Sequence, residues 1–125
     1  MKNLAATIIA GFLLVFQGYA LAGGIVDDVK QVRQSNREAV IDISDIAKKY
    51  ISLASAKNSV EDYLQAQKFA LHNQPMALDG SQTLIAVYAE KRLLDFGFHD
   101  EIRVVVVFVN DKVVRVNGKL IFRAL

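Results

Sequence analysis

The sequence predicts an α+β fold, in which two or three N-terminal helices pack on one face of a three- to four-stranded antiparallel meander. Three observations predict this fold. Apolar residues recur at helical spacing between residues 44 and 71, β-branched residues dominate the chain after residue 102, and turn-forming dipeptides separate the β-rich runs. Helices that precede the strands, instead of alternating with them, are typical of the α+β class.

The first 22 residues have the three parts of a secretory signal peptide. Lys2 supplies the positive charge, residues 4–16 form the apolar stretch, and an Ala-Leu-Ala cleavage site ends at Ala22. We predict cleavage after Ala22, which gives a periplasmic or secreted protein that begins at Gly23. The alternative is an uncleaved membrane anchor, because about 20 apolar residues are long enough to span a bilayer.

Composition excludes several classes of protein. The 125-residue chain has no cysteine, which excludes a lipidated cysteine, disulfides and thiolate metal sites. The 103 residues that follow residue 22 suit a single domain. The net charge is +2, or +1 without Lys2, and charges of both signs are interspersed. We therefore expect no nucleic-acid partner, and contact with a membrane only through an uncleaved signal segment.

Residues 23–43 form a lead-in segment, and residues 44–125 form the α+β domain. Val26, Val29 and Val32 recur at a spacing of three, which is compatible with a helical lead-in or with a mobile terminus. The domain's first helix is predicted to start at Ser44, whose side chain can cap the free N–H groups. Its apolar stripe consists of Ile46, Ala47, Tyr50, Ile51 and Ala54.

A second helix is predicted within residues 55–71. Ser55 or Ser59 can cap its start, and Pro75 prevents it from continuing. His72 would then follow its C-terminus, where a cation is favourable.

The remaining chain predicts strands joined by tight turns. A turn at Asp79-Gly80 precedes a strand over residues 83–89, and residues 90–101 are interpreted as a loop. Three β-rich runs follow, which are residues 103–109, 112–116 and 119–123. Asn110-Asp111 and Asn117-Gly118 separate them as two-residue hairpin turns.

These two turns would fix the register, and with it the two faces of the sheet. The face that packs against the helices would carry Val104, Val106, Phe108, Val113, Leu120 and Phe122, with Arg115 as its only charge. The second face would carry Val105, Val107, Val109, Val114, Val116 and Ile121, with Lys112, Lys119 and Arg123 at its rim.

The second face is the candidate functional site, because "VVVVFV" lacks the polar alternation of a strand with one wet face. The predicted protein-binding residues are Val105, Val107, Val114, Ile121, Lys112 and Lys119. Their partner would be another protein or a second copy of the chain. The alternative is that the three valines of the lead-in segment, or the loop of the first strand, cover this face within the same chain.

No catalytic, cofactor-binding or metal-binding residue is predicted. His99 lies beside Asp95, Asp100 and Glu101, and such an imidazole can act as a general base or a metal ligand. However, consecutive residues of a regular element cannot all point at one ion, so we interpret this segment as a polar loop. A phosphate-binding glycine loop and a Gly-x-Ser-x-Gly elbow are both missing from the sequence.

Two stretches resemble the small envelope proteins of the BamE/SmpA/OmlA type. "SVEDYLQAQKF" is similar to the second helix of that family, and "VVVVFVNDKVVRV" is similar to its strand pair. The family's lipidated cysteine is missing, "SLAS" replaces the Gly-Met or Gly-Leu before that helix, and "HNQPM" has no clear equivalent of the Gly-x-Pro after it. The resemblance implies two helices before an antiparallel sheet, and an accessory or scaffolding role in the cell envelope.

The function predicted from the sequence is therefore an exported, non-enzymatic domain that binds protein through a sheet face or edge. The alternative is a small inhibitor or immunity-type protein directed at an exported enzyme. That protein would use the loop at residues 95–101 as its plug.

Overall fold

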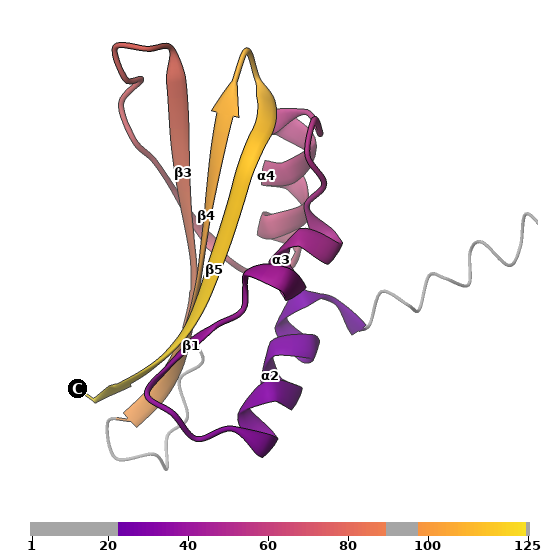
Figure 1. Cartoon of the computed structure of the whole chain (residues 1–125). Helices are drawn as coiled ribbons and strands as arrows, with labels where there is room; N and C mark the ends of the chain where they lie inside the picture. The colour runs from indigo at the N-terminus through magenta and orange to yellow at the C-terminus, as the bar shows by residue number, and fades with distance from the viewer. Residues whose placement is uncertain (1–22, 90–97, 125) are drawn as a thin grey trace, which may run out of the picture.

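Three helices lie on one face of a five-stranded antiparallel sheet in the computed structural model (Figure 1), which describes residues 23–89 and 98–124. The helices are α2 (Ile25–Ser35), α3 (Ser44–Tyr50) and α4 (Lys57–Ala66). The strands are β1 (Val40–Asp42), β2 (Ala70–Asn73), β3 (Ser81–Ala89), β4 (Phe98–Val109) and β5 (Lys112–Ala124). Their order in the sheet is β1-β5-β4-β3-β2.

This architecture confirms the predicted α+β class and the meander, which runs from β2 to β5. The sheet has five strands instead of three or four. The additional strands are short: β1 forms at the end of the lead-in segment and pairs with β5, and β2 forms where the second helix was expected to end.

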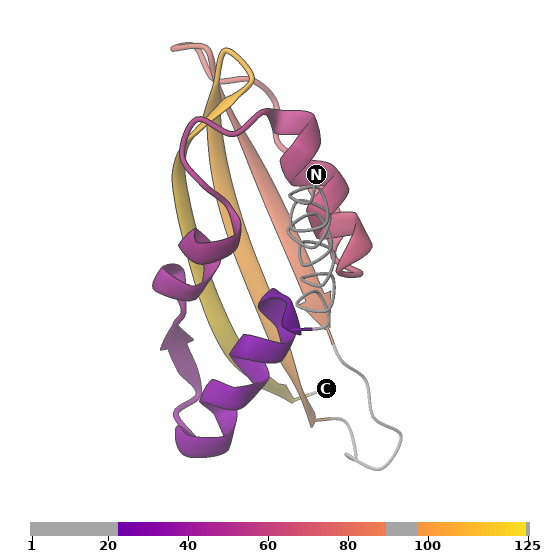
Figure 2. The ribbon, with the colours of Figure 1, turned by 90° about the vertical axis from the view of Figure 1, so that its right-hand side faces the viewer.

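The lead-in segment forms a helix that packs on the same side of the sheet as α3 and α4. Ile25, Val26 and Val29 of α2 are buried in one core cluster with Val104 and Val106 of β4. Figure 2 looks onto this helical layer, with α4 over the upper part of the sheet and α2 over the lower part. The alternative in which the lead-in valines cover the second face is therefore wrong, because Val26 and Val29 are buried on the first face and Val32 packs against the same core.

Helix α3 begins at Ser44, but the Ser44 side chain does not cap it. The residue at the N-cap position is Ile43, and Asp42 Oδ1 accepts the hydrogen bond from the Ser44 N–H, at 2.9 Å. The Ser44 hydroxyl instead accepts a hydrogen bond from the Gly118 N–H, at 3.0 Å. This hydrogen bond connects the start of α3 to the middle of β5.

Helix α4 is shorter than predicted. It lies over Lys57–Ala66, and its start has no side-chain cap from Ser55 or Ser59. Lys68 adopts a positive φ of 73°, which reverses the chain after the helix. The following residues form β2, in which His72 lies opposite Ile85. The prediction that His72 follows a helix C-terminus is therefore wrong.

The Asn110-Asp111 turn is confirmed, because both residues have positive φ and Val109 pairs with Lys112. Asn117-Gly118 is not a turn, since β5 continues through it to Ala124. A register shift also occurs near the start of β5, so that Val107 lies opposite Arg115 and Val106 lies opposite Val116. Val114 is the extra residue of this bulge.

Because of the bulge, two residues of β5 lie on the opposite face of the sheet from the one predicted. Val116 is 1% exposed and belongs to the core, whereas Arg115 is exposed. Phe108 lies on the face that packs against the helices, as predicted, and shares the core with Leu64 and Ile51. Phe122 does not, because 48% of it is exposed near the end of β5.

Candidate binding surfaces

The face of the sheet opposite the helices, called the open face below, carries an apolar strip. Its central residues lie on β3 and β4, where Thr83 pairs with Val107 and Ile85 pairs with Val105. These residues are half-buried, and they alternate along both strands with fully buried residues of the core. In Figure 1, α2, α3 and α4 all lie on the other side of the sheet. Within the described part of the chain, no helix covers this strip.

Cations border the strip on the side of β5. The side chains concerned are exposed, and they are Lys112, Arg115, Lys119 and Arg123. Because Val113 and Val116 are both buried, Val114 and Arg115 between them both face the open side. The strip therefore has one flank that is strongly basic.

The structure places the six predicted binding residues on one surface. Val105, Val107 and Ile121 are half-buried on the open face, and Val114 is 47% exposed at the bulge. The rim residues are Lys112, which lies opposite Val109, and Lys119, which lies opposite Arg103.

Sequence reasoning missed the residues that β3 adds to this surface. They are Thr83, Ile85 and Val87, and each lies opposite an open-face residue of β4. These three residues share a face because they alternate with Leu84 and Ala86, which are fully buried, but their place beside β4 depends on a strand pairing that "TLIAVYA" does not indicate.

A buried carboxylate, that of Glu101, lies on the open face near the start of β4. Glu101 is only 8% exposed and accepts hydrogen bonds from Arg103 Nη2 at 2.7 Å and from Arg123 Nε at 3.1 Å. Burial by itself raises the pKa of Glu101, but the hydrogen bonds from Arg123 and Arg103 outweigh it and hold this pKa below its usual value. The cluster therefore fixes two arginines at the edge of the strip.

His99 lies in β4 opposite Arg123, so the prediction of a loop at this position is wrong. The next two residues point to opposite sides of the sheet. Asp100 pairs with Arg33 of α2 at 3.1 Å, whereas Glu101 faces the open side. Asp95 lies outside the described residues. Across residues 23–89 and 98–124, no three acidic or histidine side chains come together in a way that could hold a metal ion.

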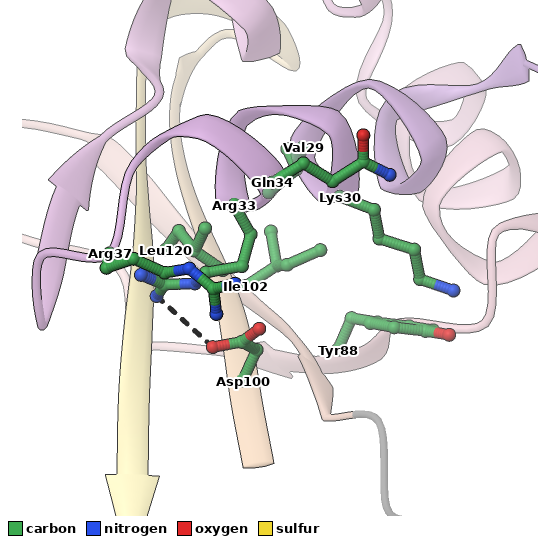
Figure 3. Close-up of a pocket in the computed structure, with 9 residues that line it drawn as sticks. All are labelled: Val29, Lys30, Arg33, Gln34, Arg37, Tyr88, Asp100, Ile102 and Leu120. Atoms are coloured by element: carbon green, nitrogen blue, oxygen red, sulfur yellow. Dashed lines mark ion pairs between the residues drawn. The ribbon is translucent and has the colours of Figure 1, made fainter.

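A pocket of about 210 Å³ lies on the helical side, between α2 and the lower end of the sheet (Figure 3). Its apolar floor consists of Val29, Ile102 and Leu120, all of which are buried. Its polar lining consists of Lys30, Arg33, Gln34, Arg37, Tyr88 and Asp100. In Figure 3 the Lys30 ammonium and the Tyr88 hydroxyl end on one side of the pocket, away from Arg33 and Asp100.

In comparisons with protein-family models, curated proteins and solved structures, the chain matched none. None of the helices in the described residues is long and apolar enough to cross a membrane.

Proposed function

We propose that this protein is an exported, non-enzymatic binding module of the cell envelope, which holds a partner protein on the open face of its sheet. The observation that carries the proposal is the apolar strip of β3 and β4, over which the described chain places no helix. A face of this kind is typical of an interaction site in a soluble domain.

Charge indicates the chemistry of the partner. The open face carries four exposed cations on β5 against two carboxylates, which are Asp42, opposite Lys119, and the buried Glu101, which is paired with Arg103 and Arg123. A partner with acidic groups beside an apolar surface would complement it. A second copy of the chain would bring a face with the same excess of positive charge, which is unfavourable for pairing. We therefore favour a different protein over a homo-oligomer.

The export part of the proposal rests on the signal pattern that ends at Ala22. Cleavage there would leave α2 intact, including Ile25, which is fully buried. It would also leave Gly23, whose carbonyl oxygen lies 2.9 Å from the Tyr50 hydroxyl. N-terminal sequencing of the exported protein should give Gly23 as its first residue. A retained Met1 in the membrane fraction would contradict this part.

The binding part can be tested with Val107→Asp, which places a carboxylate at the centre of the strip. Val107 is half-buried on the open face, so we expect the variant to stay folded and to lose the partner recovered from envelope extract. Leu53→Asp is the matched control, because Leu53 is 65% exposed in the turn after α3 and the change in charge is the same. This control should retain the partner.

A third variant calibrates the folding measurement. Val106 is fully buried on the opposite face, so Val106→Asp should unfold the protein, as judged by circular dichroism. If Val107→Asp also unfolds, the open face is covered and the proposal is wrong. It is equally wrong if folded Val107→Asp recovers the same partner as Leu53→Asp. Concentration-dependent sedimentation that Val107→Asp abolishes would assign the face to a second copy instead.

A further inference from the structure

Asn117 and Gly118 form the dipeptide in which asparagine loses its side-chain amide most readily, and they lie in the middle of β5. In this reaction the backbone nitrogen of the following residue attacks the side-chain carboxamide. Glycine favours the attack because it has no Cβ to hinder its nitrogen and restricts the backbone least. Asn117 is exposed on the open face, opposite Val105, so water can reach its carboxamide. The stability of this amide therefore depends on how the Gly118 nitrogen is held.

The Gly118 nitrogen is held by a side chain and not by a neighbouring strand. The Gly118 carbonyl oxygen accepts a hydrogen bond from the Ile43 N–H at 2.9 Å, as the next pair of the β1·β5 ladder would. The Ile43 carbonyl oxygen does not return this bond, because it accepts from the N–H groups of Ile46 and Ala47 at the start of α3. The Gly118 N–H instead donates to the Ser44 hydroxyl at 3.0 Å. Ser44 thus replaces the backbone acceptor that a continued β1 would supply.

Close packing of α3 explains why a glycine occupies this position. A Cβ at residue 118 would lie 3.2 Å from Cδ1 of Ile43 and 3.4 Å from Cβ of Ala47. Glycine within a strand often marks such a close approach. The reactive dipeptide is therefore a consequence of the packing, and the same packing buries Gly118 away from water.

We propose that Asn117 is a deamidation site that the Ser44 hydroxyl protects. Attack requires the backbone of Asn117 to leave its extended conformation, and the bond from Gly118 to Ser44 opposes this change. Once that bond opens, the Gly118 nitrogen loses its proton to base and bonds to Cγ of Asn117, while the Cγ–Nδ2 bond breaks and ammonia leaves. Water then opens the resulting succinimide at either carbonyl, which gives aspartate or isoaspartate.

Both products change the open face. Each places a carboxylate between Arg115 and Lys119, on the basic flank of the apolar strip. Isoaspartate also lengthens the backbone by a methylene group, so the two halves of β5 cannot both keep their register with β4. The reaction itself belongs to the chain alone and does not depend on the function proposed for this face.

The test follows Asn117 in the purified protein by peptide mass spectrometry, which separates the asparagine, aspartate and isoaspartate forms. At mildly alkaline pH, Ser44→Ala should deamidate at Asn117 about two- to tenfold faster than the wild type, the factor that corresponds to the net contribution of one hydrogen bond. Ser44→Thr keeps a hydroxyl and should retain the wild-type rate. The wild type unfolded in urea should deamidate faster than any of these folded proteins.

Tyr50→Phe is the control for a general loss of stability. It removes a hydroxyl from the same helix, and that hydroxyl contacts Asp28 and Gly23 instead of Gly118. Its rate at Asn117 should equal that of the wild type. Ser44→Cys provides a second variant if Ser44→Ala does not fold, because a thiol is a weaker acceptor than a hydroxyl.

Asn58 is an internal control within each sample. The N–H of the following residue, Ser59, donates to the Ala56 carbonyl oxygen at 3.1 Å, so the rate at Asn58 should not respond to Ser44→Ala. Equal rates at Asn117 in the wild type and in the folded Ser44 variant would overturn the proposal. So would an equal acceleration in Tyr50→Phe, or a folded wild type that deamidates as fast as the unfolded chain.

Discussion

Val107 on β4 lies opposite Arg115 on β5, with Val114 as the extra residue of a bulge beside this pair. The bulge is the reason that Val113 and Val116 are both buried although two residues separate them. It places Arg115 next to the apolar strip and keeps Val116 in the core. The chemical character of both faces of the sheet therefore depends on this one irregularity.

Deletion of Val114 should leave the protein folded. Without this residue, Val113, Arg115 and Val116 alternate regularly between core and open face, and the rest of β5 keeps its partners. We expect the free energy of unfolding, measured in urea, to fall by no more than about 2 kcal/mol.

Deletion of Asn117 is the control, because it removes one residue from a regular part of the same strand. It would turn Leu120 toward the open face and Lys119 into the core, which should unfold the protein. If the Val114 deletion also unfolds the protein, the register described for β5 is wrong.

Phe108 and Phe122 should respond very differently to truncation. Phe108 is 1% exposed, so Phe108→Ala should lower the free energy of unfolding by about 3–5 kcal/mol. Phe122 is 48% exposed, so Phe122→Ala should cost less than about 1 kcal/mol. Both free energies of unfolding should be measured by urea denaturation under the same conditions. Similar losses in the two variants would contradict the assignment of Phe108 to the core and of Phe122 to the surface.

The sequence predicted the fold class, the Asn110-Asp111 hairpin and the strand after Gly80, because each depends on local patterns. It did not predict β2, because Leu71 lies at helical spacing from Val60 and Leu64 and therefore fits the continuation of the preceding helix. The positive φ of Lys68 decides between helix and strand, and this conformation has no signature in a lysine.

The candidate site was predicted only in part, for a related reason. The open-face residues of β4 follow from the two-residue turn at Asn110-Asp111, which determines which side chains of the preceding strand share a face. The contribution of Ile85 and Val87 depends on the pairing of β3 with β4, which local patterns do not determine. The sequence "KVVRV" of residues 112–116 does not predict the bulge at Val114 either, because a valine is compatible with both faces of the sheet.

The Tyr50 hydroxyl should contribute to the stability of the start of α2. It donates to Asp28 Oδ2 at 2.6 Å and also lies 2.9 Å from the Gly23 carbonyl oxygen. Tyr50→Phe should therefore lower the free energy of unfolding by about 1.5–3 kcal/mol, the range for a hydrogen bond to a charged group. Tyr88→Phe is the control, because no hydrogen bond of the Tyr88 hydroxyl occurs within the described residues. A fully stable Tyr50→Phe would contradict the role of this hydroxyl.

Tyr50 also predicts how stability depends on pH in alkaline solution. Burial and the hydrogen bond to Asp28 raise the pKa of Tyr50 to about 12. Because the folded pKa is higher than the unfolded value of about 10, the contribution is fully present below pH 10 and is lost as the pH rises toward 12. In an ultraviolet titration of the folded protein, Tyr50→Phe should remove a tyrosine that ionises near pH 12. The Tyr50→Phe variant should also lose less stability between pH 10 and pH 12 than the wild type does.

Glu101 predicts the opposite dependence in acid. The hydrogen bonds from Arg123 and Arg103 hold the pKa of Glu101 below its unfolded value of about 4.3. Its contribution to stability is therefore present above that pH and is lost as the pH falls through the lower folded pKa. Asp28, Asp42 and Asp79 also have lowered pKa values, so part of the acid sensitivity will remain in any single variant.

The variant that isolates this contribution is Glu101→Gln, which cannot titrate. Its thermal midpoint should fall less than that of the wild type between pH 7 and pH 3. At pH 7 it should be less stable, because glutamine has no negative charge and only one acceptor oxygen for the two arginines. Glu38→Gln makes the same chemical change at an exposed position and should follow the wild type at both pH values. If the stabilities of Glu101→Gln and Glu38→Gln depend on pH in the same way, the titration of Glu101 does not contribute to the loss of stability in acid.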